Sequence, residues 1–169
     1  RSTAPKDSVL VPTLNEAKNL LHVLPMIPDF VDEIVLIDGG STDATIAVAQ
    51  ELVPDVVIIR EPRPGKGRAL RTGFYASTGD IIVTIDADGS TDPREIPRFV
   101  NMLLSEADFV KGSRFMHGGG TADMGPLRRV GNWALMQAVR VSFGGRYTDL
   151  CYGFNAFWRD VLPFIDDTS

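Results

Sequence analysis

Short apolar runs alternate along the chain with segments in which apolar residues recur at helical spacing, and this alternation constrains the fold most strongly. The runs predict strands at residues 9–11, 33–37, 56–59, 80–85 and 108–111. The other segments predict helices at residues 16–24, 43–52, 67–77, 93–105 and 130–143. Strands separated by helices of about ten residues pair in parallel, with helices on both faces of the sheet. The sequence therefore predicts one α/β domain over residues 1–169, with a mostly parallel central sheet flanked by helices.

The two ends of the chain do not follow this alternation of strands and helices. Residues 148–157 are expected to form either a short strand or a loop that returns over the functional site. The chain begins at Arg1 rather than at a methionine, and it ends just after an apolar segment. We therefore expect it to be part of a longer protein.

The composition argues against several classes of protein. The chain carries 17 Lys and Arg residues against 22 Asp and Glu, and this net charge of −5 argues against general nucleic-acid binding. No apolar run approaches the roughly 20 residues that span a bilayer. The lone cysteine, Cys151, excludes an internal disulfide and fits a reducing compartment.

Polar residues cluster directly after four of the predicted strands, at residues 13–16, 38–43, 64–68 and 86–92. In open parallel sheets, ligands bind beyond the carboxyl ends of the strands. We therefore expect the four clusters to meet at one edge of the sheet and to form the functional site there.

The pair Asp86 and Asp88 is the most informative part of these clusters, because it leaves the end of an expected buried strand as Asp-x-Asp. Two carboxylates at that spacing can bind Mg²⁺ or Mn²⁺, which prefer oxygen ligands and bridge to a diphosphate. The alternative is a simple turn, since Asp, Gly and Ser are common in loops. The position at a strand end, beside three other polar clusters, favours metal binding.

Two further segments can serve a ligand or the fold alone. Asp38, at the end of the second strand, can accept hydrogen bonds from a nucleobase or ribose, while Thr42 or Asp43 is expected to cap the next helix. Residues 60–71 carry five basic residues against one acid, Glu61, at the start of a helix, which suits an anionic phosphate. The spacing fits neither a Walker A nor a dinucleotide motif, and such a run is also typical of a solvated face.

Six segments occur in an order that resembles family 2 glycosyltransferases. They are VPTLNEAKNL, IVLIDGGSTDAT, GKGRAL, DADGSTDP, KGSRF and TDLCYGFNAF. The resemblance covers roughly residues 8–162 and is strongest to the dolichyl- and polyprenyl-phosphate mannose or glucose synthase branch. It implies the GT-A fold, a Rossmann-like α/β domain. It also implies an inverting, metal-dependent transfer of a hexose from a nucleotide-diphosphate sugar of the GDP-mannose or UDP-glucose class to a polyprenyl phosphate.

The resemblance also assigns roles to residues. It implies that the nucleotide sugar contacts Pro12, Leu14, Glu16, Asp38, Gly40, Lys66, Asp86 and Ala87. The residues implied for Mg²⁺ or Mn²⁺ are Asp86, Asp88 and Ser90. The residues implied at the reacting centre are Asp88 for the metal, Arg114 and Arg129 for phosphates, and Asp149.

This sequence departs from the family pattern at three positions. Gly39 stands where the family often has a second acid, Leu14 where it commonly has an aromatic residue, and Ser90 where some members use a Gln. The branch also implies contact with a membrane surface, at its cytoplasmic face.

The acceptor and the reaction class remain open at this point. A phosphate acceptor is already anionic and needs little help from a base, whereas a hydroxyl acceptor, on a polysaccharide or protein, needs one, for which Asp149 is the candidate. The same residues are also compatible with a sugar nucleotidyltransferase and with a non-catalytic sugar-nucleotide-binding domain. Residues 118–123 are expected to close over the donor as a lid.

Overall fold

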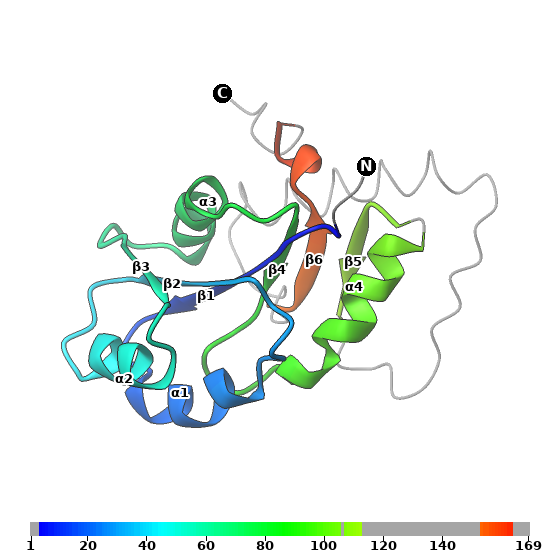
Figure 1. Cartoon of the computed structure of the whole chain (residues 1–169). Helices are drawn as coiled ribbons and strands as arrows, with labels where there is room; N and C mark the ends of the chain where they lie inside the picture. The colour runs from blue at the N-terminus through cyan, green and yellow to red at the C-terminus, as the bar shows by residue number, and fades with distance from the viewer. Residues whose placement is uncertain (1–3, 106, 113–152, 164–169) are drawn as a thin grey trace.

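The computed structural model describes residues 4–105, 107–112 and 153–163, and a six-stranded sheet forms their centre (Figure 1). The strands are β1 (Asp7–Thr13), β2 (Glu33–Asp38), β3 (Val57–Arg60), β4 (Ile81–Thr84), β5 (Phe109–Lys111) and β6 (Asn155–Trp158). They lie in the order β3-β2-β1-β4-β6-β5. β1 to β4 pair in parallel, and β6 lies antiparallel between β4 and β5. The predicted mostly parallel sheet is confirmed. Of the two alternatives expected for residues 148–157, a short strand or a loop, the described residues show the short strand, β6.

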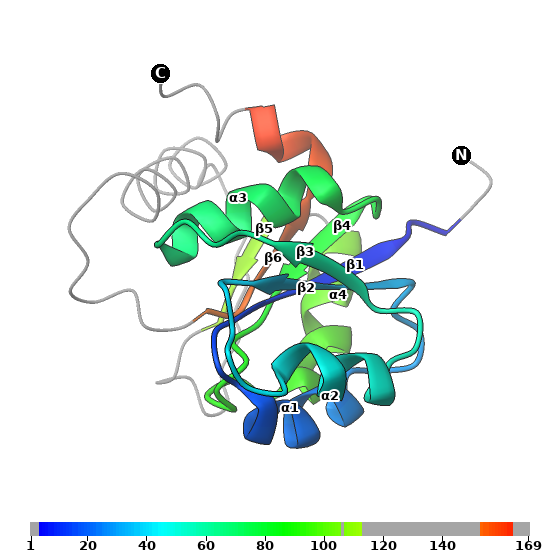
Figure 2. The same ribbon diagram turned by 90° about the vertical axis from the view of Figure 1, so that its left-hand side faces the viewer.

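Helices cover both faces of this sheet, as predicted. α1 (Ala17–Val23), α2 (Thr45–Leu52) and α4 (Ile96–Leu104) lie on one face, and α3 (Lys66–Ala76) lies on the other (Figures 1 and 2). There are three single 3₁₀ turns within the described residues: η1 (Leu24–Met26) follows α1, η2 (Pro93–Glu95) precedes α4, and η3 (Arg159–Val161) follows β6. Within the described residues, none of the helices combines the length and the apolar character needed to cross a bilayer.

Each central strand contains an uninterrupted apolar run because both faces of the strand are buried there. In β1, Val9 and Val11 pack into the core beneath α1, α2 and α4, while Leu10 packs into the core beneath α3. Successive side chains of a strand point to opposite faces, so an uninterrupted apolar run is required where helices cover both faces. This requirement explains why the short runs of the sequence identify the strands.

Aromatic contacts fix β6 in the sheet. Phe154, which is fully buried, stacks on Phe99 of α4 with ring centroids 4.0 Å apart. On the opposite face, Phe157 meets Phe74 of α3 edge to face at 5.3 Å. These contacts hold the chain just before β6 against α4, and β6 itself against α3.

Some helix boundaries differ from the prediction. α2 begins at Thr45 with Ala44 in the N-cap position, so neither Thr42 nor Asp43 is the cap residue, although the Asp43 carboxylate accepts a hydrogen bond from Thr45 N at 3.0 Å. Pro93 opens η2, and α4 follows it from Ile96. The helix predicted at residues 130–143 lies outside the described residues.

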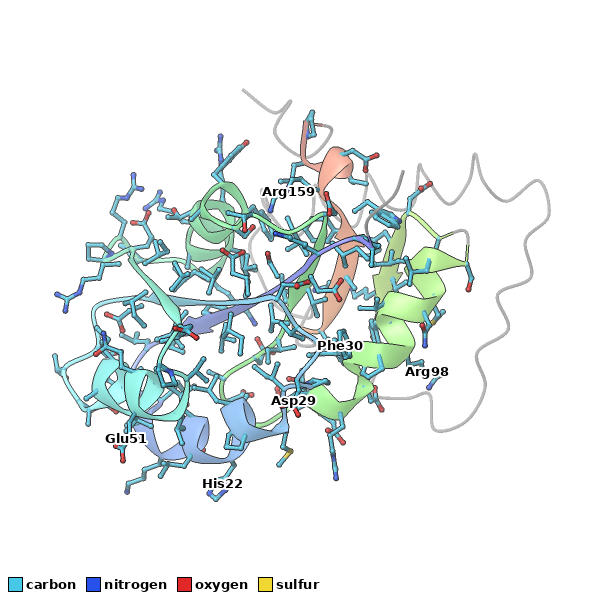
Figure 3. The ribbon with its side chains drawn as sticks, viewed as in Figure 1. His22, Asp29, Phe30, Glu51, Arg98 and Arg159 are labelled. Carbon is cyan, nitrogen blue, oxygen red and sulfur yellow. The ribbon has the colours of Figure 1, made fainter. Side chains whose placement is uncertain are left out.

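Arg159 closes the carboxyl end of α3 (Figure 3). Its guanidinium donates to Gly79 O at 2.5 Å, to Phe74 O at 3.2 Å and to Ser77 Oγ at 2.9 Å. The last carbonyl groups of a helix lack partners within the helix, so a side chain that supplies donors there stabilises the helix end.

We predict that Arg159→Met lowers the free energy of unfolding by about 1–3 kcal/mol, because it removes the donors to Gly79 O and Ser77 Oγ and leaves Phe74 O with the bond from Ser77 Oγ. Arg94→Met is the matched control, since Arg94 pairs with Asp92 through a side chain that is 73% exposed and should contribute little. Urea unfolding of both variants measures the difference. Equal losses in the two variants would contradict the role of Arg159.

A buried carboxyl group begins β1 at the amino edge of the sheet. Asp7 is 5% exposed, and its Oδ1 has no hydrogen-bond partner among the described residues. Burial first, and then the negative charges of Asp32 and Asp80, raise the pKa of Asp7 to about 6. The folded chain therefore binds this proton more tightly than the unfolded chain does.

This raised pKa predicts a stability that falls as the pH rises. Between about pH 4 and pH 6 the folded state holds more protons than the unfolded state, so its free energy of unfolding decreases through that window. Asp7→Asn should remove this slope and stabilise the chain above pH 6 by about 1 kcal/mol, after allowance for solvent screening. Thermal melts from pH 4 to pH 8 test this, with the exposed acid Asp55, changed to Asn, as control. A slope that persists in Asp7→Asn would contradict the prediction.

Candidate functional site

The loops that follow β1, β2, β3 and β4 are joined to one another by hydrogen bonds and an ion pair at the carboxyl edge of the sheet. The loop after β1 bonds to the loop after β2, as Asn15 Oδ1 accepts from Thr42 N at 2.8 Å. The loop after β3 bonds to the end of β2, since Glu61 N donates to Asp38 O at 2.9 Å. The structure thus brings together the four polar clusters that the sequence singled out.

Asn15 organises the first two loops, and sequence reasoning did not identify it. Its backbone has φ 56°, a left-handed conformation that asparagine adopts more readily than most residues. Its Oδ1 accepts from Thr42 N and, at 3.3 Å, from Asp43 N, while its own N donates to Ser41 Oγ at 2.9 Å. Asp43 in turn accepts from Ala17 N, the first residue of α1, at 3.2 Å.

Asp38 builds the turn that follows β2. The residue is 2% exposed, and its carboxylate accepts hydrogen bonds from Gly40 N at 3.1 Å and from Ser41 N at 3.2 Å. Gly40 has φ 96°, a conformation that a side chain would strain. These contacts present the backbone of residues 39–41 at the carboxyl edge.

The residues after β1 form the rim beside this turn. Leu14 is 57% exposed, and Pro12 is half-buried in the strand before it. Glu16 is half-buried and accepts from Asn19 Nδ2 at 2.7 Å. An exposed leucine next to backbone polar groups can pack against a flat ring.

Lys66 and Asp86 form an ion pair between the start of α3 and the end of β4. The second oxygen of the Asp86 carboxylate accepts from Gly153 N at 3.0 Å, so three separate segments meet at this one side chain. Gly153 must lack a side chain, because a Cβ there would collide with the Asp86 carboxylate. Sequence reasoning missed Gly153, although it lies two residues before β6 and within the segment TDLCYGFNAF.

The remainder of the Asp-x-Asp loop offers oxygen atoms at the surface. Asp88 is exposed and accepts from Ser90 N at 2.9 Å, whereas Ala87 is 3% exposed and packs into the core. Ser90 Oγ is a buried hydroxyl oxygen with no hydrogen-bond partner among the described residues. Oxygens from Asp86, Asp88 and Ser90 are the donor type that Mg²⁺ and Mn²⁺ prefer.

The described residues contain no group of three or more His, Cys, Asp or Glu side chains that forms a metal site on its own. A divalent cation bound through one or two carboxylates and a ligand's phosphates requires no such group. Four predicted features lie outside the described residues: Arg114, Arg129, Asp149 and the expected lid at residues 118–123.

Comparison with known proteins shows similarity to glycosyltransferases. The family described as "Glycosyl transferase family 2" matches residues 8–164. An uncharacterized glycosyltransferase of Mycobacterium tuberculosis is 43% identical over 107 residues, which cover 63% of this chain and 48% of that protein. An undecaprenyl-phosphate mannosyltransferase of Micrococcus luteus is 32% identical over 166 residues, covering 93% of this chain and 68% of the relative.

Solved structures with a similar fold belong to glycosyltransferases as well. The chain is similar to glucosyl-3-phosphoglycerate synthase from Mycobacterium tuberculosis, with a TM-score of 0.63 and 30% identity. The likeness covers 94% of this chain and 58% of the other. That enzyme was crystallised in complex with Mn²⁺, UDP-glucose and phosphoglyceric acid. This chain therefore spans little more than half the length of that enzyme, and the predicted GT-A fold is confirmed.

We predict that Gly153→Ala destabilises the chain by about 1–3 kcal/mol, because the added methyl group must displace the Asp86 carboxylate or the backbone. The matched test is Asp86→Ala, which removes the colliding atoms. The cost of Gly153→Ala should become smaller in the Asp86→Ala background, as a double-mutant cycle by urea unfolding measures. Additive effects of the two changes would show that these residues do not collide.

Proposed function

The chain belongs to glycosyl transferase family 2, and from this premise we propose that it transfers a hexose from a nucleotide-diphosphate sugar to a lipid phosphate of the polyprenyl type. The donor we propose is of the GDP-mannose or UDP-glucose class, and transfer proceeds with inversion at the anomeric carbon. The observation that carries the proposal is the meeting of Lys66, the Asp-x-Asp loop and the turn after Asp38 at one edge of the sheet.

The donor's nucleoside is proposed to lie over the first two loops. Leu14 supplies exposed apolar surface, and residues 39–41 supply backbone polar groups beside it. The diphosphate is proposed to lie near Lys66, whose side chain is 52% exposed despite its ion pair with Asp86. α3 begins at this lysine, and the amide groups at a helix start favour bound anions.

Mg²⁺ or Mn²⁺ is proposed to bind between the Asp-x-Asp loop and the donor. Asp88 is exposed at this position, and Ser90 Oγ, which has no partner within the described part of the chain, lies in the same loop, so the oxygen set fits a hard divalent cation. Such a cation neutralises the charge that develops on a departing diphosphate. Asp86, held by Lys66 and Gly153 N, is proposed to fix the loop and to contact the cation through its water.

A phosphate group on the acceptor removes the need for a general base. A phosphate oxygen is anionic at neutral pH and attacks without a general base. We assign Arg114 and Arg129 to this phosphate, because guanidinium groups suit bidentate contacts with phosphate oxygens, and Asp149 to the reacting centre. The relatives named as undecaprenyl-phosphate mannosyltransferase and polyprenol monophosphomannose synthase support a lipid phosphate. A lipid acceptor places the reaction at a membrane surface, which we propose to be its cytoplasmic face.

A small phosphorylated acceptor is the second candidate. It is favoured by the likeness to glucosyl-3-phosphoglycerate synthase, which was crystallised with phosphoglyceric acid and UDP-glucose. Such an acceptor reacts through a hydroxyl group and requires a base, for which we propose Asp149. A nucleotidyltransferase differs from both candidates because it releases pyrophosphate rather than a nucleoside diphosphate.

We predict that one class of nucleotide sugar stabilises the protein in thermal melts with Mn²⁺ and that EDTA or Asp88→Asn abolishes the shift. A ligand at about 100 times its dissociation constant adds roughly 2.7 kcal/mol, which moves the melting temperature by several degrees. Asp92→Asn is the matched control: it neutralises an acid of the same loop while asparagine still caps η2, so the melting temperature without ligand should change little and the ligand shift should remain.

Product analysis with the same donor identifies the acceptor. The stabilising donor is incubated with undecaprenyl phosphate or with phosphoglycerate, and the release of nucleoside diphosphate is measured. The first acceptor should support turnover and the second should not. No shift with UDP- or GDP-sugars, or an equal shift in Asp88→Asn, would contradict the proposed function.

A further inference from the structure

Glu61 is a buried carboxylate within the most basic segment of the chain. Residues 60–71 contain five basic residues and this one acid, and Glu61 is 4% exposed. A charged side chain at such a position requires partners that replace the lost water. The neighbouring basic residues of the segment are exposed, so Glu61 differs from the solvated face that the sequence also suggested.

Four donors converge on the Glu61 carboxylate. Oε1 accepts from Arg63 N at 3.2 Å and from Arg63 Nε at 2.7 Å. Oε2 accepts from the Arg63 guanidinium at 2.5 Å and from Thr72 Oγ1 at 2.8 Å. The hydrogen bonds from Arg63 first, and then from Thr72, lower the pKa of Glu61 to about 2. The carboxylate therefore stays ionised at every pH at which the protein would be assayed.

These contacts tie three elements together across a short connection. The Glu61 backbone N donates to Asp38 O at the end of β2, and its side chain reaches Thr72 in the second turn of α3. Between them, residues 62–65 run as Pro-Arg-Pro-Gly and lead directly to Lys66. Prolines restrict this connection, and a helix behaves as a rigid rod over one or two turns. Fixing Thr72 therefore also fixes the start of α3.

Lys66 is the residue at that start, and its position decides whether it reaches Asp86. Its side chain is long and 52% exposed, so nothing in its own packing sets its direction. The direction of Lys66 is instead set by the two contacts of Glu61, which hold α3 at Thr72 and the connection at Asp38.

We propose that Glu61 is a positioning residue for the donor site: it holds the connection between β3 and α3 so that Lys66 meets both Asp86 and the donor's diphosphate. The donor in this inference rests on the proposed function, whereas the geometry of Lys66 does not. Glu61 itself touches neither the donor nor the reacting atoms in this scheme.

Three variants of the full-length protein test the inference. Glu61→Gln keeps the size of the side chain but removes its charge and one of its acceptor oxygens. Thr72→Val removes a single donor to Glu61 and serves if Glu61→Gln does not fold. Glu33→Gln is the matched control, because Glu33 also accepts from a hydroxyl group, Ser8 Oγ, and from a backbone amide, Thr78 N, but lies at the opposite edge of the sheet.

The first readout is the affinity for UDP-glucose and GDP-mannose with Mn²⁺, measured by calorimetry alongside steady-state kinetics. We expect the dissociation constant of the donor to rise roughly tenfold in Glu61→Gln and about threefold in Thr72→Val, with kcat at saturating donor changed less than about twofold. Glu33→Gln should leave the dissociation constant unchanged. A purely structural role would instead reduce the fraction of active protein and leave the affinity per active site unchanged.

The second readout needs no ligand. Hydrogen exchange of the amides of residues 63–69 should become faster in Glu61→Gln and in Thr72→Val but not in Glu33→Gln. Unchanged exchange, or a donor affinity equal to that of the wild type in both Glu61→Gln and Thr72→Val, would overturn the inference. If the wild type binds neither nucleotide sugar, the proposed function fails as well, and this outcome is distinct from a loss seen only in the variants.

Discussion

The contact between Asp86, Lys66 and Gly153 is the interaction on which the site depends, because it joins three parts of the chain that are distant in sequence. Asp86 lies two residues after β4, Lys66 begins α3, and Gly153 precedes β6. A carboxylate at the end of a buried strand must find donors, and here one comes from each of the other two segments. The Asp-x-Asp loop, the start of α3 and the approach to β6 are therefore placed by one side chain.

The antiparallel strand β6 makes this meeting possible. Parallel strands all send their carboxyl ends to the same edge, so the loops after β1 to β4 gather there without further help. A segment that precedes a parallel strand would lie at the opposite edge. Because β6 runs antiparallel, with Asn155 paired to Thr84 at the end of β4, its beginning lies at the carboxyl edge and delivers Gly153 to Asp86. The stacking of Phe154 on Phe99 holds the chain at that point.

The sequence predicted the parallel part of this arrangement because strands buried on both faces contain short, uninterrupted apolar runs. The uninterrupted apolar residues of β1 and β4 and the polar residues that follow them located both the sheet and its functional edge. The roles of Gly153 and Glu61 left no such signal. Gly153 matters only because Asp86 comes close to it in space, and Glu61 lies in a run whose basic composition suggests solvent exposure. Contacts of this kind form between residues that are distant in sequence and meet only in the folded chain. The spacing of apolar residues along the sequence does not reveal them.

Two buried carboxylates at opposite edges of the sheet, Glu61 and Asp7, have pKa shifts in opposite directions. At the carboxyl edge, Glu61 receives four hydrogen bonds, and its pKa falls to about 2. At the amino edge, Asp7 is buried beside Asp32 and Asp80, one of its oxygens finds no hydrogen-bond partner in the described ranges, and its pKa rises to about 6. At the carboxyl edge, side-chain and backbone donors surround the buried carboxylates of Glu61 and Asp38, and the basic segment of residues 60–71 begins there. An edge whose donors hold the buried Glu61 carboxylate ionised is suited to hold the phosphates of a ligand by the same means.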